Sequence, residues 1–592
     1  MSSQIGNRHT LNRKRLVFGF MFLALFIGGN LLFHSIPDDV VRKMNNFTTT
    51  SDGVPICFDV FEPREGVALN RNGLKRAVIL GHGVMVNKEA LRLIAVEVAK
   101  TGLVAVAFDF RSHGQSGGDF LPVAQPIADS ILGEGESSGL PVGQESGELP
   151  FELEFLKEDI DAIKLYLSAR GDIDMHNLGY LGYSMGGGAG FAKLGDDPDF
   201  IAMVGLAPAV NLKYVDANRP RNLLLLIGLL DEAIPVQSMY NVMEKRTGIP
   251  ASELASDQLY GDFNTGNATK LVTDPVGEHY LAPYNPLFIR EAVNWFRKAL
   301  LDIPPSESHF IYPWLFVFFM MQAIGGIGLF FIVAGTVISK YSTKREPKEL
   351  LALHEKPVKT HIAYLYIILF SHILMVVGIP LYATPMLVAG FECMLMLGPS
   401  MAAWFYIRHV YKEQGLTVRK IYSNLFQTSS RINLALGVGL GFFLYLLLWG
   451  SFGNLMGIWP GWFRVAWAPL FMIVCVFIFS NFIFVFQIIR QEQAERCRKP
   501  PSSLFRLGLE NYVLNMAITI YVLGLPSVII DFYFLMMFPI PLAVIMGLVS
   551  FIATYFYRKT KDILIPSIIS GIFVSMFYLS MSLVIPLYRL SF

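Results

Sequence analysis

Short apolar runs recur between about residues 35 and 308, separated by polar or amphipathic stretches. A short, uninterrupted apolar run is typical of a strand that is buried on both faces, as in a parallel sheet. Helical stretches lie between most of these runs, which favours an α/β domain with a mostly parallel sheet and helices on both faces. The runs predicted as strands are Arg76–Leu80, Leu103–Phe110, Leu178–Tyr183, Ile201–Leu206 and Asn222–Leu229.

Much longer apolar runs lie on either side of this region. Leu16–Phe33 carries no charged residue, and almost everything after Phe310 is apolar. A helix needs about 20 apolar residues to cross a bilayer, so we expect one transmembrane helix before the polar region and about eight after it. The later runs are Phe310–Ile338, Ile362–Phe391, Ile432–Gly453, Val465–Ile489, Tyr512–Ile530, Phe532–Tyr557 and Ile563–Tyr588. The segment from Ile362 to Ile407 is long enough for two helices that turn near Pro380–Pro385.

These runs divide the chain into successive parts. Residues 1–15 form a basic tail, residues 16–34 a transmembrane helix, residues 35–308 the α/β domain and residues 309–592 an all-α polytopic membrane domain. No small-x-small cleavage site follows Phe33. We therefore interpret the first helix as a signal anchor and not as a cleaved signal peptide.

Composition agrees with a membrane protein, because 53% of the residues are hydrophobic and 16% are charged, against about 25% charged residues in a soluble domain. The formal net charge of +1 gives no reason to expect nucleic acid as a partner. The 4 cysteines are scattered, which argues against a zinc site or a disulfide framework. Membrane lipid is the partner that this composition favours, and oligomeric state is left open.

The charges between the apolar runs indicate an orientation. With the amino terminus in the cytoplasm and the helices alternating, the outer segments hold only Arg464 and Arg589. The inner segments hold Lys340, Lys344, Arg345, Lys348, Lys356, Lys359, Arg408, Lys412, Arg419, Lys420, Arg431, Arg490, Arg496, Arg498, Lys499, Arg506, Arg558, Lys559 and Lys561. Basic residues gather on the cytoplasmic side of membrane proteins. We therefore expect a multi-pass cell membrane protein whose α/β domain is extracytoplasmic.

A candidate nucleophile follows the third predicted strand. Gly182-Tyr183-Ser184-Met185-Gly186 is a G-x-S-x-G motif, and it leads into a helix of small residues. In such a motif a strained turn exposes the serine hydroxyl above the sheet, and glycines are needed because the strand and the helix approach closely. The strand and the further glycines that follow make Ser184 a candidate nucleophile.

A nucleophilic serine needs a base and an acid that orients the base, and in this arrangement they follow in the order acid, then histidine. Asp231 ends a predicted strand, with Glu232, Asp262 and Asp274 as alternative acids, and a helix cap as an alternative role for Asp231. His279 follows a later strand and precedes an amphipathic helix near Asn285–Leu301. These positions predict Asp231 and His279 as the remaining members of a triad.

Backbone amides are expected to stabilise the oxyanion that forms when a carbonyl is attacked. The loop after the first predicted strand, Gly81-His82-Gly83-Val84, is placed to supply the Val84 amide, and Met185 supplies the second. Gly81, His82, Gly83, Gly182 and Gly186 are expected to support these loops. His82 and His113 are interpreted as shaping their turns, with proton transfer as the alternative.

With these motifs, the domain resembles the α/β-hydrolase superfamily, close to dienelactone hydrolases and prolyl-oligopeptidase-like enzymes. The resemblance rests on Gly81–Gly83, the stretch Phe108–Gly117, Gly182–Gly186, Asp231 and His279, and covers about residues 50–300. It implies a serine acyl-enzyme acting on an ester, thioester or amide, without a cofactor or metal. The stretch 119–150, rich in Gly, Pro, Ser and Glu, departs from the family and is interpreted as a lid or insert.

Two ionisable residues, His372 and Glu392, interrupt the apolar runs of the membrane domain. Such groups are costly in a bilayer and usually have a partner. On consecutive antiparallel helices, both are expected roughly 10–15 Å below the outer surface. We hypothesise that they pair, either as a structural feature or as part of a polar path or lipid headgroup site.

Together these features predict a membrane-bound serine hydrolase, esterase- or lipase-like before peptidase-like, acting on an acyl ester or a peptide. Transfer of the acyl group to a membrane acceptor is an alternative. Because about eight further helices are more than an anchor requires, a transporter or lipid-handling protein whose outer domain processes its cargo is the rival interpretation.

Overall fold

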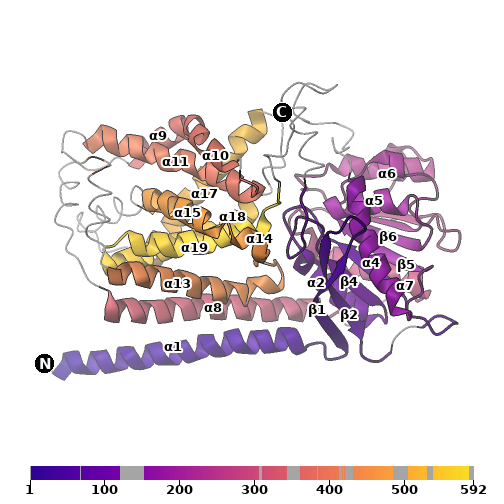
Figure 1. Ribbon diagram of the computed structural model, residues 1–592, viewed down its shortest axis with the longest axis horizontal. Coiled ribbons are helices and arrows are strands. Elements are labelled where there is room, and N and C mark those ends of the chain that lie inside the picture. Colours follow the sequence, from indigo (N-terminus) through magenta and orange to yellow (C-terminus); the bar gives the residue numbers. More distant parts are fainter. Residues whose placement is uncertain are drawn as a thin grey trace.

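The computed structural model describes residues 2–66, 69–120, 153–305, 310–342, 360–382, 384–411, 431–483, 504–529 and 538–585, together with residues 417, 419 and 536. Residues 40–301 contain the sheet and form what we call the sheet domain, and the described helices of residues 2–35 and 312–581 form what we call the helical domain (Figure 1). The predicted lid, residues 119–150, lies outside the described residues from position 121 onward.

A 9-stranded sheet in the order β1-β2-β4-β3-β5-β6-β7-β9-β8 forms the sheet domain. The strands are β1 (Val40–Thr49), β2 (Pro55–Pro63), β3 (Ala77–Gly81), β4 (Val104–Phe108), β5 (Leu178–Tyr183), β6 (Phe200–Leu206), β7 (Leu223–Gly228), β8 (Leu259–Tyr260) and β9 (Thr269–Asp274). Neighbours from β4 to β9 pair in parallel, and β1, β2 and β8 add antiparallel strands at the two sides. The carboxyl ends of the parallel strands therefore share one edge of the sheet, which we call the carboxyl edge.

Strands β3, β4, β5, β6 and β7 follow the apolar runs to within a residue or two, and β9 is the later strand expected before His279, whereas the apolar-run criterion misses β1, β2 and β8. Most residues of β1 are polar, and exposed and half-buried positions alternate along it from Arg42 to Thr49. Alternation of this kind is expected at the edge of a sheet, where one face of the strand meets water.

Helices cover both faces of the sheet, as predicted. Helices α2 (Arg92–Lys100) and α7 (Pro286–Leu301) lie on one face. Helices α4 (Lys157–Arg170), α5 (Met185–Leu194) and α6 (Val236–Thr247) lie on the other. Because successive side chains of a strand point to opposite faces, Val78 packs in the first apolar layer and Ile79 in the second.

Among the described residues, 8 helices are long and apolar enough to cross a membrane. They lie within α1 (Ser2–Ser35), α8 (Tyr312–Tyr341), α9 (Thr360–Leu374) with its extension to Leu381, α11 (Leu387–Tyr411), α13 (Arg431–Trp449), α17 (Leu504–Ile529), α18 (Pro539–Thr560) and α19 (Leu564–Met581). The run Val465–Ile489, predicted as a further crossing, contains α15 (Ala468–Phe482), which is shorter. The helices run side by side, with the sheet domain at one end of the bundle (Figure 1).

Buried polar contacts join the carboxyl ends of β3 and β4 to the helical domain. Arg464, in the short helix α14 (Gly461–Val465), is 2% exposed, and its guanidinium donates to the carbonyls of Ser112, Gly114 (2.7 Å) and Ser582 (2.8 Å). The amide of Val584 donates to Ser112 Oγ at 2.6 Å. A single side chain thus connects the loop after β4 with the segments around α14 and after α19.

A further pair of contacts lies on the β3 side of the interface. The side chain of Asn87, in the loop after β3, donates to the carbonyl of Gly457 at 2.6 Å. Arg92, at the start of α2, donates to the carbonyl of Asn454 at 2.9 Å. The loops after β3 and β4 are therefore fixed to the helical domain by hydrogen bonds.

Replacing Arg464 is expected to loosen this interface. The substitution Arg464→Leu leaves several buried carbonyl groups without a donor, which costs about 3 kcal/mol or more of unfolding free energy. Arg290→Leu is the matched control, because the Arg290 side chain is 45% exposed on α7. Thermal unfolding of the detergent-purified protein should show a clear decrease for the first variant and little change for the second. Equal stability of the two variants would contradict the role given to Arg464.

Candidate active site

Ser184 occupies a sharp turn between β5 and α5. Its φ of 51° and ψ of −115° are rare for residues other than glycine. A Cβ on Gly182 would lie 2.4 Å from the carbonyl oxygen of Gly186, and a Cβ on Gly186 would lie 2.4 Å from the carbonyl oxygen of Gly81. Only glycine fits at these contacts, so the predicted reason for the motif holds in the structure. The turn places the Ser184 side chain at the carboxyl edge of the sheet.

Two further loops at the carboxyl edge bring Asp231 and His279 to this serine. The Oγ of Ser184 and the Nε2 of His279 are 2.9 Å apart. The Nδ1 of His279 lies 2.8 Å and 3.0 Å from the two carboxylate oxygens of Asp231. A carboxylate accepts the Nδ1 proton, which leaves Nε2 as the acceptor for the serine hydroxyl. The structure therefore joins the three predicted residues in one hydrogen-bonded series.

The electrostatic surroundings of His279 favour a proton acceptor. Burial alone disfavours the imidazolium, but the charge of Asp231 and its hydrogen bond raise the pKa of His279 above the ordinary value of 6.5. Glu232 and Glu278 act in the same direction. A base that is strengthened in this way can take the proton of a serine hydroxyl as the hydroxyl attacks a carbonyl.

Asp231 both orients the imidazole and caps its own loop. One carboxylate oxygen accepts two backbone amides of the residues that follow it, and both oxygens lie within hydrogen-bond distance of the His279 ring. The carboxylate of Glu232 accepts the backbone amide of His279 at 3.4 Å. Asp262 and Asp274 accept hydrogen bonds from groups of their own neighbourhoods. Of the acids considered from the sequence, Asp231 is the one that is bonded to the ring.

The two amides predicted to bind an oxyanion lie beside Ser184. Met185 follows it directly and begins α5. The loop after β3 approaches so closely that a Cβ on Gly83 would lie 3.0 Å from the Ser184 Cβ. Within the described residues, the amides of Val84 and Met185 donate no hydrogen bond. Both can therefore donate to a bound oxygen, and that role stays a prediction.

His82 and His113 have structural positions near the site. The Nδ1 of His82 is bonded to the Gly83 carbonyl at 2.7 Å, and its Nε2 accepts the amide of Phe110 at 3.1 Å. Burial lowers the pKa of His82 to about 4. The Nδ1 of His113 is bonded to the carbonyl of Arg111 at 2.9 Å. His82 thus uses both ring nitrogens to hold adjoining loops, which fits the interpretation that these histidines shape turns.

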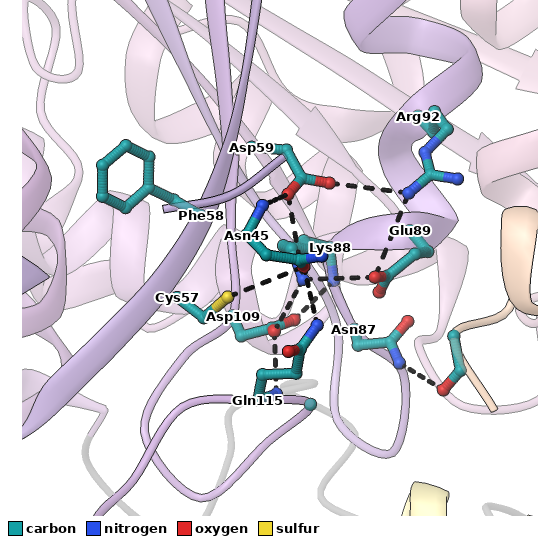
Figure 2. Close-up of polar contacts among 12 residues, drawn as sticks. Asn45, Cys57, Phe58, Asp59, Asn87, Lys88, Glu89, Arg92, Asp109 and Gln115 are labelled. Atoms are coloured by element: carbon teal, nitrogen blue, oxygen red, sulfur yellow. Dashed lines mark hydrogen bonds and ion pairs between the residues drawn. The ribbon is translucent and has the colours of Figure 1, made fainter. Parts of the chain in front are cut away.

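A buried cluster of charges holds the end of the loop that carries Val84 (Figure 2). The ammonium group of Lys88 lies 3.1 Å from Glu89, 3.2 Å from Asp109 and 4.0 Å from Asp59. Lys88 is 1% exposed, and burial of an ion is tolerated when opposite charges surround it. Asp109 also accepts the Lys88 amide at 2.8 Å and thereby ties the loop after β3 to the end of β4.

Sequence reasoning missed Lys88, because a lone lysine before a helix usually points into water. Asp109 is the residue whose position in the sequence could have indicated this cluster, since it follows a buried strand that pairs directly with β3. Arg92 extends the same cluster: its guanidinium lies 3.5 Å from Asp59 and also donates to the carbonyl of Asn454. The cluster therefore links the loop that carries Val84 to the helical domain.

The helical domain forms part of the surroundings of the serine. Met85 and Tyr280, next to Val84 and to the base, are buried in the same apolar cluster as residues of α11 and α19. Leu583 and Ile585, which follow α19, belong to the apolar cluster that contains Met185. Apolar packing is therefore continuous from residues next to Ser184, Val84 and His279 to the helical domain.

His372 and Glu392 do not pair, contrary to the hypothesis from the sequence. Both carboxylate oxygens of Glu392 and the Nε2 of His372 are buried without a hydrogen-bond partner in the described residues. The His372 ring packs edge-on against Tyr521 of α17, with ring centroids 5.1 Å apart. Glu392 instead lies within electrostatic reach of Tyr578 on α19. Similar depth on neighbouring helices is not sufficient for pairing, because the two side chains must also face each other.

Similarity to known proteins is found among solved structures and covers 44% of this chain. No family model matches the chain, and no curated protein matches it. An esterase from Pyrococcus furiosus is 17% identical, with 44% of this chain and 93% of that chain covered and a TM-score of 0.30. A predicted CIB-like hydrolase from Thermoplasma acidophilum is 17% identical, with 44% and 99% covered and a TM-score of 0.30. A cold-adapted esterase from an Arctic intertidal metagenomic library is 18% identical, with 44% and 95% covered and a TM-score of 0.29.

The raised pKa of His279 makes a prediction about pH. The free imidazole is needed to accept a proton, so kcat/KM for a neutral ester should fall as the pH drops through the pKa of His279, which lies above 6.5. Asp231→Asn removes the charge that raises this pKa. The rate should therefore fall by about 10⁴-fold and the acid limb of the residual activity should move to lower pH. An acid limb at the same pH in both proteins would contradict the assignment.

Proposed function

We propose that this protein is a membrane-bound serine hydrolase that cleaves acyl esters through an acyl-enzyme. The observation that carries the proposal is the hydrogen-bonded series from Ser184 through His279 to Asp231. A serine that is bonded to a base, with the base oriented by a buried acid, is the arrangement that activates a hydroxyl as a nucleophile. The strained turn exposes the hydroxyl, and the amides of Val84 and Met185, which donate no hydrogen bond to any residue that the structure describes, can donate to the oxygen of an attacked carbonyl.

In the first half of the reaction, the Oγ of Ser184 attacks the ester carbonyl while its proton passes to Nε2 of His279. Asp231 stabilises the imidazolium, and the amides of Val84 and Met185 donate to the oxyanion. The imidazolium then protonates the leaving alcohol, and the acyl group remains on the serine. In the second half, His279 takes a proton from water, the resulting hydroxide attacks the acyl group, and the serine regains its proton as the acid leaves.

The proposed setting is the outer face of a cell membrane. In the described residues, the helix ends away from the sheet domain carry basic residues such as Lys340, Arg431 and Lys559. At the end near the sheet domain, Arg464 is buried against that domain and does not face lipid headgroups. This distribution favours a cytoplasmic amino terminus and an extracytoplasmic sheet domain under the positive-inside rule.

The surroundings of the serine support an acyl ester over a peptide as the substrate. Met85 and Met185, the residues directly after Val84 and Ser184, are apolar and belong to the apolar clusters of this part of the structure. Contacts of this kind favour a hydrocarbon chain, since they offer few hydrogen-bond groups to a peptide backbone. The same acyl-enzyme could pass its acyl group to an alcohol in the membrane, and product analysis separates the two outcomes.

The proposal predicts ester hydrolysis that depends on the serine and the histidine. Purified protein should release free acid from p-nitrophenyl esters, and Ser184→Ala or His279→Ala should lower kcat by at least about 10³-fold. Matched controls are Ser168→Ala and His176→Ala, because both residues are exposed away from the triad. The controls should retain wild-type rates. Equal activity of Ser184→Ala and Ser168→Ala would refute the proposal, and transfer of the acyl group to an added alcohol without acid release would favour an acyltransferase.

A further inference from the structure

The two loops that carry Asp231 and His279 expose large apolar side chains. Leu229 is 50% exposed and Leu230 61% in the loop after β7, and Val276 is 76% and Leu281 47% exposed beside His279. His279 itself is 1% exposed and the Asp231 side chain is equally covered. Single exposed apolar residues are ordinary. Several of them in two adjoining loops at one site indicate a surface that binds a protein, a membrane or a ligand.

We call these four residues the apolar rim, and the two loops that carry them are in contact. The amide of Leu229 donates to the carbonyl of Asp274 at 2.8 Å, and the amide of Leu230 donates to the carbonyl of Gly277 at 3.0 Å. A Cβ on Gly228 would lie 2.0 Å from the Gly277 carbonyl oxygen, so the two loops touch backbone to backbone. The rim is therefore joined by its backbone to the two loops that carry Asp231 and His279.

The apolar rim belongs to the carboxyl edge, which faces the helical domain. Strands β3, β5, β6, β7 and β9 run parallel, so the loops that follow them lie on the same side. The loop after β3 is bonded to the helical domain through Asn87. Tyr280 is buried against helices of that domain, and Leu281, the next residue, belongs to the rim. The rim therefore lies next to the contact surface between the two domains, but its side chains are exposed.

Exposed aromatic side chains mark the level of a membrane surface near this edge. Trp462 is 80% and Phe463 59% exposed on α14, and Trp314 is 60% exposed in the first turns of α8. Both helices meet the sheet domain (Figure 1). Tryptophan gathers where hydrocarbon meets headgroups. Lipid of the adjoining leaflet is therefore the partner at the height of the carboxyl edge.

We propose that the apolar rim lies on the lipid leaflet next to the sheet domain and admits an uncharged acyl ester from the bilayer to Ser184. This proposal rests on the proposed function and specifies its substrate class. The acidic side chains at the rim, Glu232 and Glu278, bond to backbone amides of the His279 loop, and they disfavour an anionic lipid. A diacylglycerol in phosphatidylcholine nanodiscs is therefore the probe, with p-nitrophenyl acetate as the water-soluble reference.

The test compares the two substrates in rim and control variants. The double variant Leu230→Gln/Val276→Gln makes the rim polar without adding charge near the triad. Leu69→Gln/Leu165→Gln is the matched control, because Leu69 is 55% and Leu165 64% exposed elsewhere on the sheet domain. The ratio of diacylglycerol rate to acetate rate should fall roughly tenfold or more in the rim variant, since less apolar surface reaches lipid. It should be unchanged in the control.

An unchanged ratio in the rim variant would overturn the proposal, and so would an equal fall in the control. Damage to the triad lowers both rates together and leaves the ratio constant. If the wild type cleaves the acetate but not the diacylglycerol, the inference fails while the serine hydrolase stands.

Lipid contact is also measured without turnover. A fluorophore sensitive to polarity, attached to a cysteine introduced at Val276, should be quenched by brominated lipid, whereas one at Leu165 should not. Absence of quenching at Val276 would overturn the inference whatever the enzyme activity.

Discussion

The close approach of α5 to β3 and β5 is the constraint on which the site depends. A side chain at Gly182 or Gly186 would overlap backbone atoms 2.4 Å away, so the helix begins directly above the strand ends. This packing forces Ser184 to a positive φ at a cost of the order of 1–3 kcal/mol. In return, its hydroxyl points to His279 and the Met185 amide lies beside the loop after β3. The buried backbone around Ser184 holds it in this strained conformation. The serine is therefore already in position beside His279 without a rearrangement of the chain.

The same edge of the sheet is where the two domains meet. Arg464, Asn87 and the cluster around Lys88 are buried groups whose partners come from both sides or from adjoining loops. Buried polar groups specify one arrangement, because each loses a costly hydrogen bond when it is displaced. The helical domain therefore fixes the loop that carries Val84. The interface between the two domains and the geometry of the site thus depend on the same buried contacts.

Sequence reasoning reached the parallel strands and the triad because both rest on local rules. Uninterrupted apolar runs predict buried strands, and a strand, a glycine turn and a small-residue helix identify Ser184. The edge strand β1 was not predicted from the apolar runs, because its exposed face is polar. The sequence did not indicate Lys88, because the fold is needed to bring Asp59 and Asp109 from distant parts of the chain to its ammonium group. The pairing of His372 with Glu392 was wrong because depth in a membrane follows from sequence position, whereas the facing of two helices follows from packing.

The most direct test of an activated serine is covalent labelling with a fluorophosphonate probe, which phosphonylates serines that are deprotonated as they attack. Wild-type protein should be labelled at Ser184, and Ser184→Ala and His279→Ala should both lose the label while they keep the thermal stability of the wild type. Labelling that persists in Ser184→Ala, or a folded wild type that takes up no label, would contradict the account.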